Sequence, residues 1–158
     1  MKISYILPET IDGKFQLMEF VYKNTDSFIM NTFGFVWENR QWWSKFPVQV
    51  YKIDNQIIGL HAFTYNTKKE STIKTYYIVT HKAFRGQGIA KKMIIHTLNA
   101  YSEVSSNYFV NSEENSDGMH FFKKLFNDKF LLTKNEFGSL DYVFEAPIDD
   151  ILNNDKKI

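Results

Sequence analysis

The sequence has no cysteine among its 158 residues, and it has few prolines and glycines. Without cysteine the chain can form no disulfide, offer no thiolate nucleophile and bind no metal through sulfur. Apolar runs are short as well. No window approaches the length of a membrane span, and the first five residues, MKISY, lack the apolar core of a signal peptide. These absences predict a soluble, cytoplasmic protein without a membrane partner.

An excess of charge of one sign is also missing. Lysines and arginines number 19 and acidic residues 18, which leaves a formal net charge of +1. This balance gives no bulk electrostatic reason to bind nucleic acid or an anionic membrane. No histidines and carboxylates have the spacing typical of a metal site, so no bound metal is expected.

Hydrophobic residues make up 44% of the chain and aromatics 17%, so we expect a single folded domain over residues 1–158. A strand at 2–7 is followed by a helix that Thr10 or Asp12 could cap. Four apolar residues repeat in it at helical spacing: Ile11, Phe15, Met18 and Tyr22. Residues 28–46 carry many aromatics without a clean period, and a second helix with a loop is the simplest interpretation.

The remaining pattern predicts a sheet with helices. It comprises antiparallel strands at 48–53, 57–63 and 73–80, a helix at 86–103, a strand at 107–110, a helix at 117–126 and a hairpin of 130–132 with 140–144. The polar tail, 149–158, is expected to fray. The fold class is therefore α/β (α+β), with a mixed, mostly antiparallel central sheet flanked by helices.

Residues 75–93 combine a strand, a loop with two glycines and the start of a helix. Glycines let the backbone bend sharply and approach a ligand closely, and a helix start presents unpaired N–H groups and a positive dipole end. This combination can hold a phosphate or diphosphate. A Walker loop is excluded because Gly88 is followed by Ile89 and Ala90, and a dinucleotide fingerprint would need three glycines near the start of a βαβ unit.

Arg85, Gly88 and Ala90 fit the pattern Arg/Gln-x-x-Gly-x-Gly/Ala, which resembles the acetyl-CoA loop of the GNAT N-acetyltransferase superfamily. A second motif of that superfamily, Asn-x-x-Ala-x-x-x-Tyr, is similar to residues 115–122. Asn115 matches it, whereas Gly118 replaces the alanine and Phe122 the tyrosine. The resemblance covers residues 45–145 well and the first 45 loosely.

The resemblance implies acetyl-CoA as the cofactor. Backbone groups of Ile78, Val79 and Thr80 would lie along the pantetheine arm like an added strand. Asn115 would contact the pantetheine or the phosphate arm. The diphosphate would be held by the Arg85 side chain and by the amides of the following residues: Gly86, Gln87, Gly88, Ile89, Ala90 and Lys91.

The acid and base that such enzymes commonly use are absent from their usual places. Phe122 has no hydroxyl, and Val110 stands where some relatives have a glutamate. Catalysis could rest on positioning with a water-relayed proton. Another group could also substitute for the missing acid or base. Glu113 and His81 are the first choices, and the other candidates are Glu114, His61 and Tyr142. For His61, a hydrogen-bonded core or surface histidine is the favoured alternative.

The acceptor is suggested only by the aromatic segment at 28–46. Phe28, Trp37 and Trp42 could wall an acceptor pocket, although aromatics that simply fill the core are the favoured alternative. The predicted function is transfer of an acetyl group from acetyl-CoA to a primary amine on a small molecule or a protein. The alternatives are a degenerate GNAT domain that only binds acyl-CoA or another protein, and a nucleotide-binding domain of other origin. GNAT domains often pair, so a homodimer is also considered.

Overall fold

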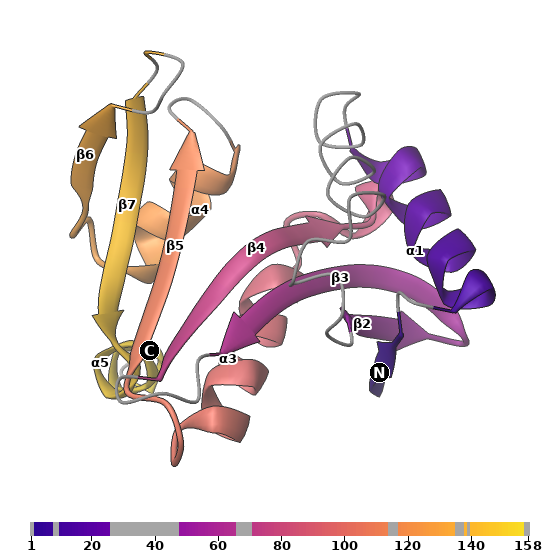
Figure 1. The fold of residues 1–158 in the computed structure, drawn as a ribbon, viewed down its shortest axis with the longest axis horizontal. Helices are drawn as coiled ribbons and strands as arrows, with labels where there is room; N and C mark the ends of the chain where they lie inside the picture. The colour runs from indigo at the N-terminus through magenta and orange to yellow at the C-terminus, as the bar shows by residue number, and fades with distance from the viewer. Residues whose placement is uncertain are drawn as a thin grey trace. The chain divides into compact units, whose positions relative to one another are not determined.

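The computed structural model of the protein describes residues 2–7, 10–25, 48–65, 71–113, 117–134, 138 and 140–156. Its strands form one sheet in the order β1-β2-β3-β4-β5-β7-β6 (Figure 1). β4 and β5 run parallel, whereas the pairs β1–β2, β2–β3, β5–β7 and β6–β7 run antiparallel. The predicted mixed, mostly antiparallel sheet flanked by helices is confirmed.

The element bounds agree with the predicted ones to within a few residues in most places. The strands are β1 (Lys2–Ile6), β2 (Val48–Ile53), β3 (Gln56–Tyr65), β4 (Thr72–Thr80), β5 (Asn107–Glu113), β6 (Leu131–Lys134) and β7 (Leu140–Pro147). The helices are α1 (Ile11–Asn24), the short 3-10 helix η2 (Lys82–Phe84), α3 (Ile89–Tyr101), α4 (Asp117–Leu125) and α5 (Ile148–Asp155).

The prediction of a frayed tail is wrong for residues 148–155, which form α5. Ile148, Ile151 and Leu152 repeat at helical spacing and are buried. The amide of Ile148 also donates to the carbonyl of Ser106, at 2.9 Å. A short apolar stripe therefore anchors a segment whose composition is otherwise polar.

The described residues fall into two compact units. Unit 1 comprises the described residues within 1–64 and 75–94, and unit 2 comprises those within 65–74 and 95–158. In unit 2, α4 packs against β5 and β7. Aromatic rings fill this contact, and they belong to Tyr108, Phe122, Phe126 and Phe144.

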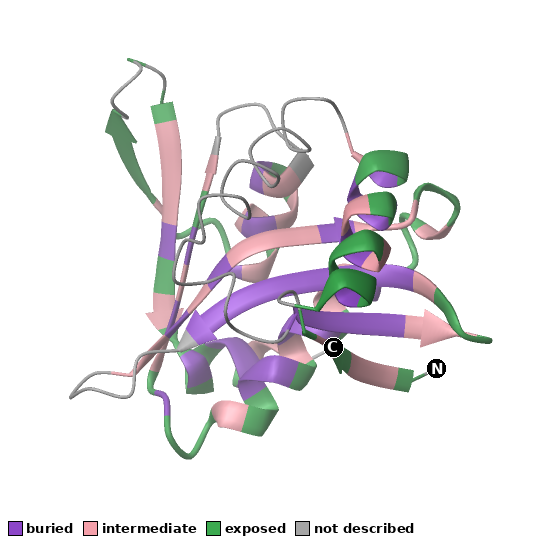
Figure 2. Ribbon diagram, turned by 45° about the vertical axis from the view of Figure 1, so that its right-hand side comes forward, coloured by how far each residue is buried: buried purple, intermediate pink, exposed green. Residues whose placement is uncertain are grey.

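Unit 1 buries apolar residues on both faces of its strands, and most of β2 and β3 is buried (Figure 2). Val50 belongs to a cluster with Leu17 and Phe20 of α1, whereas the adjacent Tyr51 belongs to a cluster with Met93 of α3. Because adjacent strand residues point to opposite faces, α1 and the start of α3 cover opposite faces of these strands.

A β-bulge lies next to the position where the start of α3 packs on β3. The β2–β3 register shifts between Tyr51 and Lys52, so that Ile58 is an extra residue in β3. A Cβ atom built on Gly59, the next residue, would lie only 2.8 Å from Cε of Met93 and 3.1 Å from Cγ2 of Ile89. The missing side chain of Gly59 therefore allows the first turns of α3 to approach β3.

Replacement of Gly59 by valine is expected to lower the free energy of unfolding by about 1–2 kcal/mol, because the added side chain overpacks the contact with Met93. Urea denaturation measures the change. The alanine variant should cost less, since only the end of the Met93 side chain has to move. A valine variant as stable as the wild type would contradict this packing.

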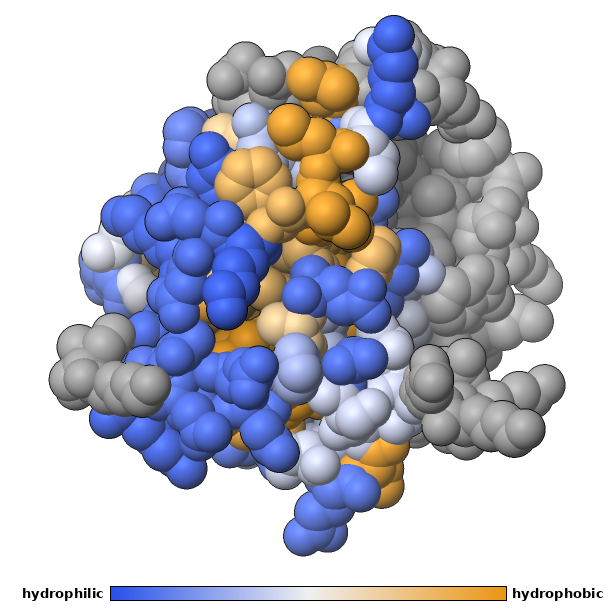
Figure 3. Space-filling view, turned by 90° about the vertical axis from the view of Figure 1, so that its left-hand side faces the viewer, coloured by the Kyte–Doolittle hydropathy of each residue, from blue (hydrophilic) through white to orange (hydrophobic). Residues whose placement is uncertain are grey.

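The exposed surface of unit 2 includes a hydrophobic area on its terminal hairpin. Hydrophobic side chains gather on the face shown in Figure 3, which is the side of β6 and β7 in Figure 1. Leu131, Leu132 and Leu140 of this hairpin are 71%, 53% and 37% exposed. The homodimer considered above stays a prediction, which sedimentation analysis can test.

Candidate functional site

The glycine loop predicted to bind phosphate lies in unit 1 between β4 and α3. After Thr80, the amide of His81 donates to the carbonyl of Ile58 at 2.8 Å, which extends the contact with β3 by one residue. η2 follows, and the loop residues Gly86 and Gly88 have φ values of 81° and 77°. These left-handed conformations suit glycine and strain other residues. The glycines thus allow the chain to turn from β4 into α3.

The space beside the two loop glycines is open among the described residues. A Cβ atom built on Gly86 or Gly88 would meet no atom within 4 Å among the described residues. The first bond of α3 runs from the Lys92 amide to the Gly88 carbonyl, at 3.0 Å. The amides of Gly88, Ile89 and Ala90 precede this donor and have no carbonyl to bond within the helix. The geometry suits an anion at this helix start.

The side chain of Arg85 is held beside this loop by two backbone carbonyls. Its Nε atom donates to the carbonyl of Thr80 at 3.3 Å, and its Nη2 atom donates to the carbonyl of Asn24 at 2.5 Å. A guanidinium has five N–H donors. These two bonds therefore fix the side chain and leave other donors able to bind an anion.

Side chains at the end of β4 pack on both faces of the sheet. Val79 is buried in the cluster with α1, and Ile78 packs on the cluster with α3. Tyr76 and Tyr77, although adjacent, both pack against the α1 cluster, which indicates an interruption of the strand alternation. Burial raises the pKa of Tyr77 to about 12 and raises that of Tyr76 against a hydrogen bond from Thr64. Both phenols therefore keep their protons at neutral pH.

His81, a tentative catalytic residue, caps η2. Its Nδ1 atom accepts from the amide of Ala83 at 3.1 Å, and its ring contacts Phe84 edge to face, with the ring centroids 5.5 Å apart. Since Nδ1 is an acceptor, Nε2 is the nitrogen that carries the proton of the neutral ring.

His61 is fully buried in β3 and takes part in a polar network across three strands. Its Nδ1 atom lies 3.2 Å from Oε1 of Gln49, and its Nε2 atom lies 2.8 Å from Oγ1 of Thr75. Nδ1 donates to the amide oxygen, so Nε2 accepts from the threonine hydroxyl. Burial lowers the pKa of His61 to about 3. The favoured alternative, a hydrogen-bonded core histidine, is confirmed.

Other candidate residues lie in unit 2 or outside the described residues. Glu113 ends β5 and is paired in register with Asp141 of β7. Phe122 is 3% exposed within the aromatic cluster, and the ring of Tyr142 packs on Phe130 with their centroids 4.7 Å apart. The predicted coenzyme contact Asn115, the candidate base Glu114 and the acceptor-site candidates lie outside the described residues, the last being Phe28, Trp37 and Trp42.

Two absences apply to the described part of the chain alone. None of its helices combines the length and the apolar character required to span a membrane. None of its histidines and carboxylates form a group of three or more that could bind a metal ion.

Asn24 makes a tertiary contact that the sequence does not predict. This residue ends α1, is only 3% exposed, and accepts a hydrogen bond from the amide of Lys82 through Oδ1 at 2.9 Å. The two residues are 58 positions apart. Asparagine is common at helix ends, so nothing local in the sequence predicts this contact.

A family model described as the acetyltransferase (GNAT) family matches residues 18–127. The match covers more than half of the chain, and it includes the strand, the glycine loop and the start of α3. The chain therefore belongs to the GNAT acetyltransferase family. Among curated proteins, no sequence matches at a significant level.

Several solved structures share the fold. A GNAT-family protein from Desulfovibrio desulfuricans superposes with a TM-score of 0.72 at 8% identity, over 93% of this chain and 98% of that one. An aminoglycoside 6'-acetyltransferase type Ii gives 0.69 at 12% identity, over 94% and 97% of the two chains. The paia N-acetyltransferase from Thermoplasma acidophilum, solved in complex with coenzyme A, gives 0.65 at 11% identity, over 93% and 99%. At these identities the likeness establishes the fold.

Proposed function

We propose that the protein transfers an acetyl group from acetyl-CoA to a primary amine on a small molecule or a protein. The observation that carries this proposal is the glycine loop, where open helix-start amides and a fixed arginine lie together at the family's coenzyme motif. The fold neighbour bound to coenzyme A supports the choice of ligand.

The coenzyme is assigned to the loop and to β4. The diphosphate binds the amides of residues 86–91 and the donors of Arg85, because a helix start and a guanidinium both favour a doubly charged anion. The pantetheine arm lies along the backbone of Ile78, Val79 and Thr80, and the side chains of Ile78 and Val79 pack on the two clusters of unit 1. Asn115 is assigned to the pantetheine or the phosphate arm on the resemblance alone.

Acetyl-CoA supplies an activated acetyl group as a thioester. The amine nitrogen attacks the carbonyl carbon, the carbon–sulfur bond breaks, the amine loses a proton and the departing thiolate gains one. For the base we keep His81 and Glu113 as proposals. In His81 the Nδ1 lone pair is occupied by the Ala83 amide, so a proton accepted from an amine would require that hydrogen bond to break first. This geometry makes a water-relayed proton, with catalysis by positioning, the simpler route.

A second candidate function is a catalytically degenerate domain that binds acyl-CoA without transfer. Phe122 favours it, since the residue at the position of the usual tyrosine acid is buried among aromatic rings and carries no hydroxyl. The two functions separate in one assay, namely the release of free coenzyme A from acetyl-CoA across a panel of amines, peptides and aminoglycosides. Acceptor-dependent release supports transfer, and coenzyme binding without release under any acceptor supports the second candidate.

Replacement of Gly88 by valine is expected to weaken coenzyme A binding at least tenfold and to lower the free energy of unfolding by about 1 kcal/mol. The left-handed backbone strains the new residue, and its side chain enters the open space in which the diphosphate would lie. Calorimetric titration and urea denaturation measure the two effects.

Gly138 provides the matched control. It also has a positive φ, of 80°, and a Cβ atom built on it meets no atom of the described residues within 4 Å. The Gly138→Val variant should therefore show a similar loss of stability with unchanged coenzyme binding. Equal binding by both valine variants would contradict the assignment of the loop.

We also propose that residues 1–158 act as one domain that is cytoplasmic. A single cooperative transition in calorimetric unfolding, in which both units melt together, is the expected result. Two separate transitions would overturn the single domain.

A further inference from the structure

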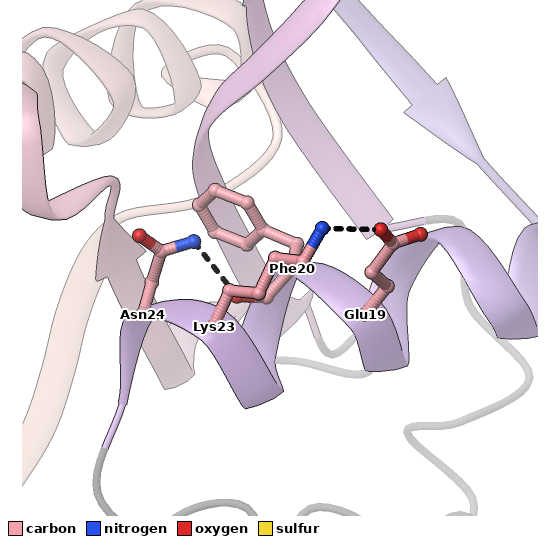
Figure 4. A network of polar contacts seen from close by, with 4 residues as sticks. All are labelled: Glu19, Phe20, Lys23 and Asn24. Carbon is pink, nitrogen blue, oxygen red and sulfur yellow. Dashed lines mark hydrogen bonds and ion pairs between the residues drawn. The ribbon is translucent and has the colours of Figure 1, made fainter.

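Asn24 is a buried polar residue at the end of α1 whose side chain is fixed on both sides. Its Nδ2 atom donates to the carbonyl of Phe20, one turn earlier, at 2.9 Å (Figure 4). This bond identifies the amide nitrogen and sets the direction of Oδ1. The neighbouring Lys23 instead forms an exposed ion pair with Glu19, at 2.6 Å, and contributes nothing to the interior (Figure 4).

The two oxygens of Asn24 both accept from the segment that precedes the glycine loop. Oδ1 accepts from the amide of Lys82 at 2.9 Å, and the main-chain carbonyl accepts from Nη2 of Arg85 at 2.5 Å. Lys82 begins η2 and Arg85 follows it. One residue of α1 therefore holds both ends of η2, directly before Gly86.

Such contacts determine the position of the loop before any ligand arrives. Glycines at 86 and 88 give the loop conformational freedom, and binding would have to overcome the entropy of ordering it. Fixing Lys82 and Arg85 reduces this cost, because the entry to the loop and its guanidinium are already in place. The carbonyl end of α1 also favours the cation that it binds.

We propose that Asn24 is a positioning residue for the coenzyme loop, which acts on the diphosphate of coenzyme A through Lys82 and Arg85. The inference rests on the proposed function, since it takes the diphosphate as the ligand of the loop. It adds a residue from α1, outside the loop motif, to the determinants of coenzyme affinity.

The test compares two ligands that differ in the part that the loop would hold. Coenzyme A contains the diphosphate, whereas pantetheine lacks it and keeps the arm assigned to β4. Asn24→Ala removes the donor to the Phe20 carbonyl and the acceptor for the Lys82 amide, of which only the second bond reaches the loop. It should weaken coenzyme A binding roughly tenfold, the loss expected when that one bond to the loop is removed. Its affinity for pantetheine, followed by NMR titration, should stay within twofold of wild type.

Thr25→Val is the matched control on the same turn. The Thr25 hydroxyl donates to the carbonyl of Val21 in α1 at 2.6 Å, so its hydrogen bond lies at the helix end and does not reach the loop. This variant loses one hydrogen bond at the same helix end, and it should bind both ligands as the wild type does. If Asn24 had only a structural role, Asn24→Ala and Thr25→Val would have the same affinities for coenzyme A and for pantetheine.

Asn24→Gln keeps the test usable if the alanine variant does not fold. It retains an uncharged amide whose oxygen can accept from the Lys82 amide, so its coenzyme affinity should exceed that of any folded variant without an acceptor at this position, such as Asn24→Leu. Coenzyme A affinity within twofold of wild type in a folded Asn24→Ala or Asn24→Leu variant overturns the inference. Failure of the wild-type protein itself to bind coenzyme A would instead overturn the proposed function.

Discussion

Acidification from pH 7 to pH 4 is expected to lower the free energy of unfolding of the wild-type protein by about 3 kcal/mol more than that of a His61→Gln variant. In the folded state, burial lowers the pKa of His61 from 6.5 to about 3. The unfolded chain therefore binds a proton first as the pH falls. The stabilisation from the neutral ring is complete above pH 6.5 and is lost progressively between pH 6.5 and pH 3.

Burial explains why protonation of His61 is so unfavourable, because a charged ring would have no solvent around it. Since Nε2 accepts from the Thr75 hydroxyl, protonation would also require this hydrogen bond to reverse its direction. Glutamine does not titrate and can still exchange hydrogen bonds with Gln49 and Thr75.

Urea denaturation at several pH values gives the free energy of unfolding of the wild-type and His61→Gln proteins as a function of pH. The same substitution at His96, which is exposed on α3, is the matched control and should leave the wild-type dependence in place. Parallel curves for the wild-type and His61→Gln proteins would contradict the buried neutral histidine.

Replacement of Arg85 by glutamate is expected to weaken coenzyme A binding roughly 100-fold. The change removes charge-assisted donors to the diphosphate, adds a like charge beside it, and breaks the bond to the Asn24 carbonyl. Calorimetric titration measures the dissociation constant. Raised ionic strength should reduce the difference between variant and wild type, because the added repulsion is screened.

Two further variants separate the loss of hydrogen-bond donors from the effect of the added charge on coenzyme A binding. Arg85→Gln stays within the Arg/Gln pattern of the family motif and keeps side-chain N–H donors, so its loss should be much smaller. Lys124→Glu makes the same charge change on the exposed side of α4 and should leave binding unchanged. If glutamate at position 85 binds coenzyme A as arginine does, the loop does not hold the diphosphate.

The sequence predicted the conformation of the loop between β4 and α3 well because its determinants are local. Positive φ at Gly86 and Gly88 and the helix start at Ile89 all follow from a short stretch of residue types. The family match over residues 18–127 agrees with the resemblance drawn from that stretch. The strand–turn–strand of β2 and β3, with positive φ at Asp54 and Asn55, was predictable for the same reason.

The sequence pattern did not predict which face of α1 is buried, because tertiary contacts determine that face. In α1, the predicted stripe does mark a helix, yet Ile11, Phe15 and Tyr22 are 70–78% exposed, and the helix buries Leu17 and Phe20 instead. Two apolar stripes share this helix, and periodicity alone does not choose between them.

The sequence also did not predict the hydrogen bonds between residues that lie far apart along the chain. Asn24 binds residues about 60 positions away, and the partners of His61 come from two other strands. Side-chain type and spacing say nothing about such pairs until the topology is known.

Equilibrium binding of coenzyme A to the wild-type protein, with ATP and NAD as competitors, tests the central claim most directly. We expect saturable binding of one coenzyme per chain that neither competitor displaces at equal concentration, together with shifts of the Gly86 and Gly88 amide resonances. Absence of binding by the folded protein, or displacement by ATP or NAD at equal concentration, would contradict it.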